Sequence, residues 1–342
     1  MTEQQERARP VPFPAGAVDG LLATAARAPS VLNTQPWLFR VTTYTIELYA
    51  DRSRKLRSDL TAREMLISCG AALFGLRLAI RGIGYQPEIS LLPEPERPDV
   101  LAAVRLGKQR PLTEAERMMI GALPHRHTHR GAYAPGPLPH GLLIGLQHDA
   151  VAEHAALALV DRPADYAHLA AIVARTARTL SADARSRADV ARWVRRPRSG
   201  ARDGVPATAT AASAGPWPGR LVQRDLNRDG KCLKAVEPLG APPTATGILL
   251  TSADTKADWL RAGQALHRIL THAATHWVFA TLYSQPFESA PTRALIRSTL
   301  GLPGAPHLLL QFGLARTTRP TARRAAADMI VGERPGRPAP IG

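Results

Sequence analysis

Two prolines enclose a short polar segment in residues 28–37, which read Ala-Pro-Ser-Val-Leu-Asn-Thr-Gln-Pro-Trp. Proline fixes its own φ and disfavours helix in the residue before it, so this segment predicts a helix end followed by a strand. Ser30, Asn33 and Gln35 then share one loop, whose shape Pro29 and the second proline restrict. Its hydroxyl, amide and backbone groups suit a flat heteroaromatic ring with alternating donors and acceptors. An ordinary helix end and turn is the alternative.

Alternating helical and strand patterns predict an α+β fold of two units, with mixed or antiparallel sheets flanked by helices. In residues 15–110 we expect helices at 15–28 and 61–83 and strands at 37–42, 45–50, 86–92 and 100–106. In residues 111–325 we expect helices at 113–123, 137–147, 255–276 and 291–299 and strands at 155–160, 247–252, 278–283 and 306–312. The two long helices each precede a strand, which indicates an internal duplication; coincidence is the alternative.

A long insertion interrupts the second unit at about residues 163–245. Two Ala- and Arg-rich helical stretches at 164–195 are followed by residues 196–245, which are rich in Pro, Gly, Ser and Arg. A loop-rich insertion of this length is usually a lid or partly disordered. The stretch from residue 325 is expected to be poorly ordered apart from local contacts.

Bulk composition narrows the class of protein. The chain has 342 residues, 45% of them hydrophobic, which is enough for one large domain or two medium ones. No apolar run reaches membrane-spanning length and the N-terminus has no signal-peptide pattern, so we expect no membrane partner. Cys69 and Cys232 are the only cysteines, which argues against a disulfide framework or a Cys-based metal site. A reducing cytoplasm fits these features.

The net charge of +16 and the isoelectric point near 10.9 raise the question of nucleic-acid binding. The charge is nearly all Arg and is spread along the chain, and aromatic residues make up only 5% of it. The sequence also lacks a zinc-finger, RNP or helix-turn-helix pattern. We therefore expect no nucleic-acid partner, with solvated surface and a phosphorylated cofactor accounting for the arginines.

A second polar segment follows the helix predicted at 113–123. It contains Arg126, His127, Thr128 and Arg130 within five residues. Arginine offers a bidentate fork to phosphate oxygens, and threonine adds a neutral donor. The histidines here alternate without a nearby carboxylate or cysteine, so we predict no metal.

Together with the C-terminal run 313–324, these segments resemble parts of the FMN-dependent nitroreductase family. The 28–37 run resembles its flavin-ring loop, 126–130 its phosphate-binding Arg-x-Ser-x-Arg segment, and 313–324 its second phosphate clamp. Ser284-Gln285-Pro286 stands where related proteins have Asn-Gln-Pro near the reactive face of the flavin. The resemblance implies the following cofactor-binding residues: Pro29, Ser30, Asn33, Gln35, Arg126, His127, Thr128, Arg130, Ser284, Gln285, and Arg323 or Arg324 or both.

The resemblance covers about residues 15–160 and 245–325 and is to the fused-repeat, Acg-type branch of the family. Nitroreductases are normally homodimers in which each FMN lies between subunits. Here the first unit has the ring loop but no Arg/Ser segment, whereas the second unit has 126–130 but no ring loop at 148–156. Folded together as an intramolecular pseudo-dimer, the units would rebuild one complete site. This implies one FMN per chain and a monomer, with a higher oligomer left open.

By resemblance, NAD(P)H reduces FMN and leaves, and an electron-poor small molecule such as a nitroaromatic or a quinone then takes the hydride. The flavin carries this chemistry, so no side chain is assigned as catalytic. Arg130 is expected to tune the flavin through its charge. An FMN-binding or sequestering protein with little turnover is the alternative, because the insertion could cover the flavin. A specialised biosynthetic dehydrogenase is a third possibility.

Overall fold

Two four-stranded antiparallel sheets form the framework of this computed structural model, which describes residues 10–196, 198–206, 209, 221–226, 243–316 and 321–332. The first sheet has the order β1-β2-β4-β3 and the second the order β5-β6-β8-β7, so each unit repeats the same topology. The α+β class is confirmed. The strands are β1 (Trp37–Val41), β2 (Ile46–Ala50), β3 (Tyr85–Leu91), β4 (Val100–Gln109), β5 (Ala156–Leu159), β6 (Ala245–Thr251), β7 (Val278–Tyr283) and β8 (Ala305–Leu314).

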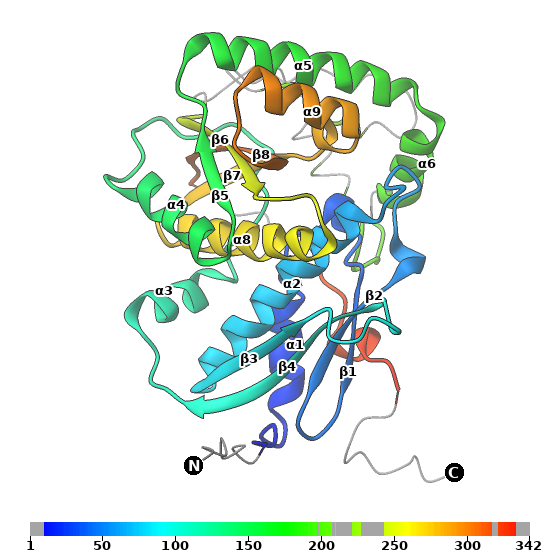
Figure 1. Ribbon diagram of the computed structural model, residues 1–342, viewed down its shortest axis with the longest axis vertical. Coiled ribbons are helices and arrows are strands. Elements are labelled where there is room, and N and C mark those ends of the chain that lie inside the picture. Colours follow the sequence, from blue (N-terminus) through cyan, green and yellow to red (C-terminus); the bar gives the residue numbers. More distant parts are fainter. Residues whose placement is uncertain are drawn as a thin grey trace, which may run out of the picture.

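Two long helices cross between the sheets, α2 (Arg63–Gly82) from the first unit and α8 (Lys256–Thr275) from the second (Figure 1). Each lies between the second and third strands of its own unit and packs closely on the other. Gly70 and Gly263, the eighth residue of each helix, mark the closest approach. A Cβ on Gly263 would lie 2.0 Å from the Ile67 carbonyl oxygen, and one on Gly70 would lie 2.2 Å from the Leu260 carbonyl oxygen. Glycine, unfavourable inside a helix, is required here by backbone contact.

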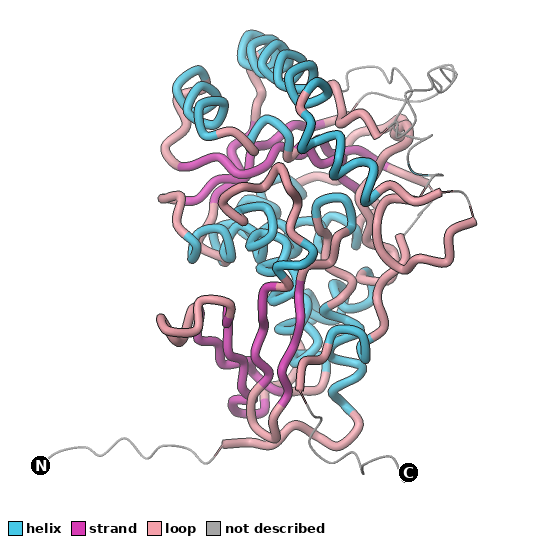
Figure 2. Tube along the Cα trace, turned by 90° about the vertical axis from the view of Figure 1, so that its right-hand side faces the viewer, coloured by secondary structure: helices cyan, strands magenta, loops and turns pink. Residues whose placement is uncertain are grey.

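The remaining helices pack around this pair and against the second sheet (Figure 2). Helix α1 packs on α2, α3 and α4 pack on α8, and α5 packs on α9. Thr113 and Glu116 form a capping box at the start of α3. These helices are α1 (Ala17–Ala25), α3 (Glu114–Ala122), α4 (Leu142–Ala152), α5 (Pro163–Ala182), α6 (Ala184–Trp193) and α9 (Ala290–Thr299), with 3-10 turns η1 (Val31–Asn33), η2 (Arg52–Arg54), η3 (Gln285–Phe287) and η4 (Ala326–Met329).

The start of α4 differs from the expected start at residue 137. The helix begins at Leu142, because Gly141 adopts a left-handed conformation with φ 73° immediately before it. Prolines at 137 and 139 lie in the segment before Gly141, and proline favours extended backbone in the residue before it. The apolar pattern of 137–141 therefore belongs to a turn.

The expectation of poor order from residue 325 is wrong for residues 325–332. Met329 is fully buried in the core of the first unit, and the Trp37 indole Nε1 lies 3.2 Å from its Sδ. Ile330 forms a parallel bridge with Phe39, and the Val331 amide donates to the Phe39 carbonyl at 2.9 Å. The C-terminal part of the chain thus completes the first sheet, a contact that no local sequence pattern encodes.

The described part of the insertion packs on the first unit. Helix α6 and the described residues Val194, Val205 and Leu226 contribute to a small hydrophobic cluster that reaches the 29–35 loop. Its buried members are Leu32, Leu56, Val190, Trp193, Val194, Val205 and Leu226. Much of the segment predicted to be a lid, including 210–220 and 227–242, lies outside the described residues.

Helix α2 is long and apolar enough to cross a membrane, which differs from the expectation that no run reaches that length. Among the described residues it is the one helix with this property. In the structure, 89% of its apolar window is buried against the rest of the protein. The apolar residues of α2 are thus accounted for by burial in the core between the sheets.

Candidate functional site

A cavity opens where the two units meet, beside the crossing of α2 and α8. Its walls come from the 29–32 loop, the first turns of α2, the 128–130 segment, the turn after β7, and residues 223–226 of the insertion. The empty space is about 870 Å³, part of it open solvent at the mouth. Six of the predicted cofactor residues line this cavity: Pro29, Ser30, Thr128, Arg130, Ser284 and Gln285. The loop and the 126–130 segment, far apart in sequence, therefore face one space.

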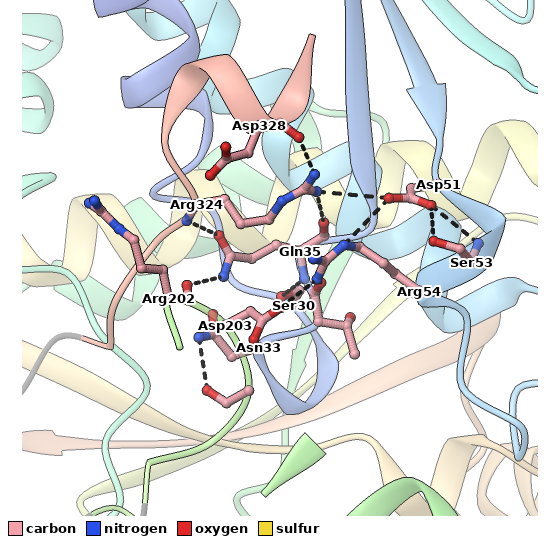
Figure 3. A network of polar contacts seen from close by, with 12 residues as sticks. Ser30, Asn33, Gln35, Asp51, Ser53, Arg54, Arg202, Asp203, Arg324 and Asp328 are labelled. Atoms are coloured by element: carbon pink, nitrogen blue, oxygen red, sulfur yellow. Dashed lines mark hydrogen bonds and ion pairs between the residues drawn. The ribbon is translucent and has the colours of Figure 1, made fainter. Parts of the chain in front are cut away.

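Asn33 and Gln35 lie outside the cavity lining and are used by the protein itself (Figure 3). The Asn33 Nδ2 donates to the carbonyls of Gly204 and Ala322 at 3.0 and 3.2 Å. The Gln35 Nε2 donates to the Arg202 carbonyl at 2.9 Å, and its Oε1 accepts from an amide of the C-terminal segment. In this arrangement both amides fasten the insertion and the C-terminal segment to the ring loop. Their predicted bonds to the flavin edge stay a prediction.

Arg324 belongs to the same fastening network. Its Nη1 donates to the Gln35 carbonyl at 3.2 Å, and its Nη2 donates to the Asp328 carbonyl. Nearby, Arg54 pairs with Asp203 of the insertion at 2.8 Å. The Arg324 guanidinium is thus engaged with the backbone of the loop and of η4, and it does not line the cavity.

Two arginines, the buried Arg126 and the partly buried Arg323, lie close to the same loop. The Nη2 of each donates to the Arg27 carbonyl, at 2.8 Å from Arg126 and 3.4 Å from Arg323. Among the described residues, Arg126 Nε and Nη1 and Arg323 Nε are buried without a hydrogen-bond partner. Burial lowers the pKa of Arg126 to about 10, with Arg27 adding to the effect. Burial lowers the pKa of Arg323 to about 9, with Arg126 contributing next.

Buried guanidinium atoms without partners destabilise the folded protein, because they lose their hydration and form no hydrogen bond in exchange. No salt bridge between described residues compensates either side chain. An anion with several acceptor oxygens would satisfy these donors together, and phosphate has that shape. Arg126 and Arg323 therefore fit a phosphate group.

His127 packs beside this pair and adds no charge. Its ring lies 4.4 Å from that of Phe279, and its Nδ1 is 3.0 Å from the His125 carbonyl oxygen. Burial is the main cause that lowers its pKa to about 4, and Arg126 and Arg130 act in the same direction. His127 is thus neutral at pH 7 and does not line the cavity. Among the described residues, no cluster of three His, Cys, Asp or Glu side chains has the arrangement of a metal site.

Glu64 was not predicted from the sequence, yet it lines the cavity and is only 4% exposed. Arg63 Nη1 donates to its Oε1 at 2.7 Å. Burial is the largest influence and raises the pKa of Glu64 to about 8, against the opposing effect of Arg63. A charged Arg-Glu pair at the start of an otherwise apolar helix is the signal that could have marked this position.

Arg63 reaches from the first unit into the second. Its Nη2 donates to the Pro306 carbonyl at 3.2 Å and to His307 Nδ1 at 2.5 Å. The His307 Nε2 lies 2.5 Å from the Thr251 hydroxyl. Burial, assisted by Arg63, lowers the pKa of His307 to about 3, so the ring is neutral and carries its proton on Nε2. Arg63 is therefore fixed at the boundary between the units.

A second buried carboxylate, Glu288, lies behind the cavity wall and pairs with Arg224 of the insertion. Among the described residues, Arg224 Nη1 and Glu288 Oε2 are buried without hydrogen-bond partners. Burial raises the pKa of Glu288, and Arg224 opposes that effect. Arg224 also lines the cavity, so the insertion brings a cation to it.

Comparisons with known proteins place this geometry in context. No protein-family model matches the chain. The chain is 31% identical over 328 residues to "Putative NAD(P)H nitroreductase Rv3131" of Mycobacterium tuberculosis H37Rv, covering 93% of this chain and 92% of that protein. It is 25% identical over 298 residues to "Putative NAD(P)H nitroreductase acg" of the same strain, covering 85% and 87%. Among solved structures, a nitroreductase with bound FMN from Desulfitobacterium hafniense DCB-2 aligns with a TM-score of 0.40 and 11% identity, over 63% of this chain and 98% of that one.

Proposed function

Because this chain belongs to the nitroreductase family, we propose that it binds one FMN and passes a hydride from NAD(P)H to an electron-poor small molecule. A nitroaromatic compound or a quinone is the proposed class of acceptor. The observation that carries this proposal is three buried guanidinium nitrogens without partners, Nε and Nη1 of Arg126 and Nε of Arg323, close to the 29–35 loop. Nothing else in the described chain gives these donors an acceptor, and the phosphate of FMN would.

Bound FMN would supply the hydride chemistry, and the chain would bind and orient it. Arg126 and Arg323 would hold the phosphate. Ser30 and Thr128 line the cavity and would contact the ring and its side chain. Arg130 lines the same cavity and would place a positive charge near the ring, where it favours an anionic reduced state. In this proposal, Asn33 and Gln35 hold the shape of the loop.

One FMN per chain follows from the pseudo-symmetry of the α2–α8 pair. Ile67 and Leu266, the fifth residue of α2 and the eleventh of α8, line the cavity. Their counterparts on the other side of the crossing are Leu260 and Leu73, and both are fully buried in the hydrophobic core. The position equivalent to the cavity is therefore occupied by core. Because the crossing brings both half-sites into one chain, we expect the enzyme to act as a monomer.

A second candidate function is FMN sequestration with little turnover. The specific observation behind it is that Gln223, Arg224 and Leu226 of the insertion form part of the cavity wall. Such a wall would restrict access for nicotinamide. The two functions differ in one measurable property, which is reduction of the bound flavin by NAD(P)H.

The test is an absorption titration of purified protein with FMN, followed by addition of NAD(P)H with and without a quinone. The proposal expects saturation at one FMN per chain, bleaching by NAD(P)H, and faster NAD(P)H consumption with the quinone present. Stoichiometric FMN without bleaching would favour sequestration. A protein that remains colourless with added FMN would overturn both.

A further inference from the structure

We propose that Glu64 is the proton donor of this site and that its carboxyl group protonates the electron acceptor during reduction. The inference rests on the proposed function and deepens it, since it assigns a reacting atom to this chain. Glu64 lies on the first turn of α2 and lines the same cavity as Ser30 and Thr128. It is the one carboxylate among the described residues that line this cavity.

The hydrogen bonds of Glu64 define which of its oxygens carries the proton. Arg63 Nη1 donates to Oε1 at 2.7 Å, and a guanidinium donates only. The proton of the neutral acid is therefore on Oε2. No hydrogen bond to any described residue engages Oε2. The donor atom is thus available to a molecule bound in the cavity.

Arg63 holds this orientation through groups of the second unit. It bonds to the Pro306 carbonyl and to neutral His307, and it also lies 3.4 Å from Asp254 Oδ1. Because several partners share its charge, Arg63 is not committed to Glu64 alone. Arg63 can donate its hydrogen bond to Oε1 whether Glu64 is neutral or ionised. A proton donor that is recharged in each cycle needs a partner that tolerates both forms.

Burial favours the protonated form of Glu64 near neutral pH, and the charges that face it act in both directions. Burial is the largest contribution, and it raises the pKa to about 8. Glu288, which follows η3, and Asp59, which precedes α2, raise the pKa further by repulsion, while Arg63 and Arg224 lower it. The other titratable groups of the cavity wall are Arg130, which is cationic, and the histidines His129 and His307.

The proposed step balances for a quinone. The quinone receives one hydride, which NAD(P)H supplied and FMN relayed, and one proton from Oε2 of Glu64. Both carbonyl C=O groups become C–OH, one gaining the hydrogen of the hydride and the other the proton of Glu64, which gives the hydroquinone, while NAD(P)H ends as NAD(P)⁺. Glu64 is left as a carboxylate beside Arg63 and regains its proton from water. General acid catalysis of this kind contributes about 10²- to 10⁴-fold to rate.

The experiment compares Glu64→Gln with Glu114→Gln, a control on the exposed face of α3. Each holoprotein is reduced by NAD(P)H, and stopped-flow absorbance then follows reoxidation by a quinone or by ferricyanide. Ferricyanide takes electrons without a proton, so it needs no acid. We expect Glu64→Gln to slow quinone-dependent reoxidation at least about 100-fold while ferricyanide-dependent reoxidation stays within about 2-fold. Glu114→Gln is expected to match the wild type with both acceptors.

The pH dependence of the reoxidation rate is a second test of the proton-donor role. In the wild type, quinone-dependent reoxidation should fall as pH rises through about 8, because the donor loses its proton. Glu64→Gln should lack this fall. Glu288→Gln removes a repelling charge and should move the midpoint to lower pH. A wild-type midpoint that persists in Glu64→Gln would overturn the proposal.

Infrared titration provides a readout that does not depend on turnover. The wild type, with and without FMN, should show a protonated-carboxyl band that disappears near pH 8 and is absent in Glu64→Gln. If the wild type binds and reduces FMN but Glu64→Gln reoxidises at the wild-type rate with a quinone, the proton-donor role is wrong. If the wild type neither binds nor reduces FMN, the proposed function fails, while the infrared band still reports the protonation of Glu64. If Glu64→Gln does not fold, the midpoint shift in Glu288→Gln decides, and an unchanged midpoint overturns the role.

Discussion

The two sides of the α2–α8 crossing have residues at equivalent helix positions, but only one side borders a cavity. On one side Ile67 and Leu266, each 5% exposed, also border a cavity, and on the other their counterparts Leu260 and Leu73 are fully buried in the core. The connecting segments account for the difference. Residues 26–36 leave a long loop before β1, whereas only residues 153–155 separate α4 from β5. Two sheets of the same strand order thus flank the crossing, and a cavity opens on the side where the connecting loop is long.

The largest expected effect comes from the matched pair Leu260→Ala and Ile67→Ala. Leu260 is fully buried, so its truncation should leave a void and lower the free energy of unfolding by about 3 to 5 kcal/mol. Ile67 already borders empty space and should cost about 1 to 2 kcal/mol. Urea unfolding measures both. Equal losses would mean that the two sides are packed alike and would break the comparison.

The crossing itself is tested by Gly263→Ala. A Cβ there would lie 2.0 Å from the Ile67 carbonyl oxygen, so the helices must separate, at a cost of about 3 kcal/mol. A Cβ on Gly121 of α3 would have nothing within 4 Å, so Gly121→Ala should be neutral or stabilising by up to about 1 kcal/mol. Thermal melting of the two variants gives the contrast. A Gly263→Ala protein as stable as the wild type would contradict close contact at this point.

Arg126→Met sharpens the functional side of the comparison. Loss of charge-assisted bonds to phosphate, about 1.5 to 3 kcal/mol, should weaken FMN binding by about 10- to 100-fold. Riboflavin, which has no phosphate, should bind as it does to the wild type. The FMN-free variant should also melt at a higher temperature, because a buried unsatisfied cation is gone.

Fluorescence titration with both flavins measures this prediction, with Arg117→Met on the exposed face of α3 as control. Equal weakening for FMN and riboflavin would argue that Arg126 acts on the ring or on the fold, and not on phosphate.

The smallest effect concerns acid stability at the twelfth position of each helix, where α2 has Phe74 and α8 has His267. Burial, with Arg126 contributing, lowers the pKa of His267 from 6.5 to about 3. Below pH 6.5 the unfolded chain binds a proton that the folded protein does not, so the free energy of unfolding falls by up to about 1.4 kcal/mol per pH unit down to about pH 3. His267→Phe should reduce this loss. Melting of FMN-free protein at about pH 7 and about pH 4.5 tests it, with exposed His140→Phe as control.

The sequence predicted most of the fold because its helices and strands carry clear local signals. The capping box at Thr113 fixes the start of α3, and β7 has the predicted bounds 278–283. The core position of Met329 was not predictable, since its partner Trp37 is 292 residues away. Periodicity reports local geometry and is silent on such pairing.

For the site, motif spacing predicted two segments, 29–35 and 126–130, whose residues reach one cavity, but not the direction of each side chain. Ser30 and Arg130 line the cavity, whereas the Asn33 and Gln35 amides bond to the insertion and the C-terminal segment. Side-chain direction depends on neighbours brought in from distant parts of the chain. Glu64 was missed because most of α2 has the apolar pattern of a core helix, although the Arg63–Glu64 pair at its start departs from that pattern.

The pairing of Trp37 with Met329 has a consequence for biosynthesis. A ribosome makes the first sheet early, yet the side chain that closes its core emerges 292 residues later. Until then Trp37 lacks its contact with Met329 of η4, and Phe39 on the edge of β1 lacks its bridge to Ile330. The first unit is therefore expected to mature only after the second has been translated, so the two halves of the polypeptide reach their final form together.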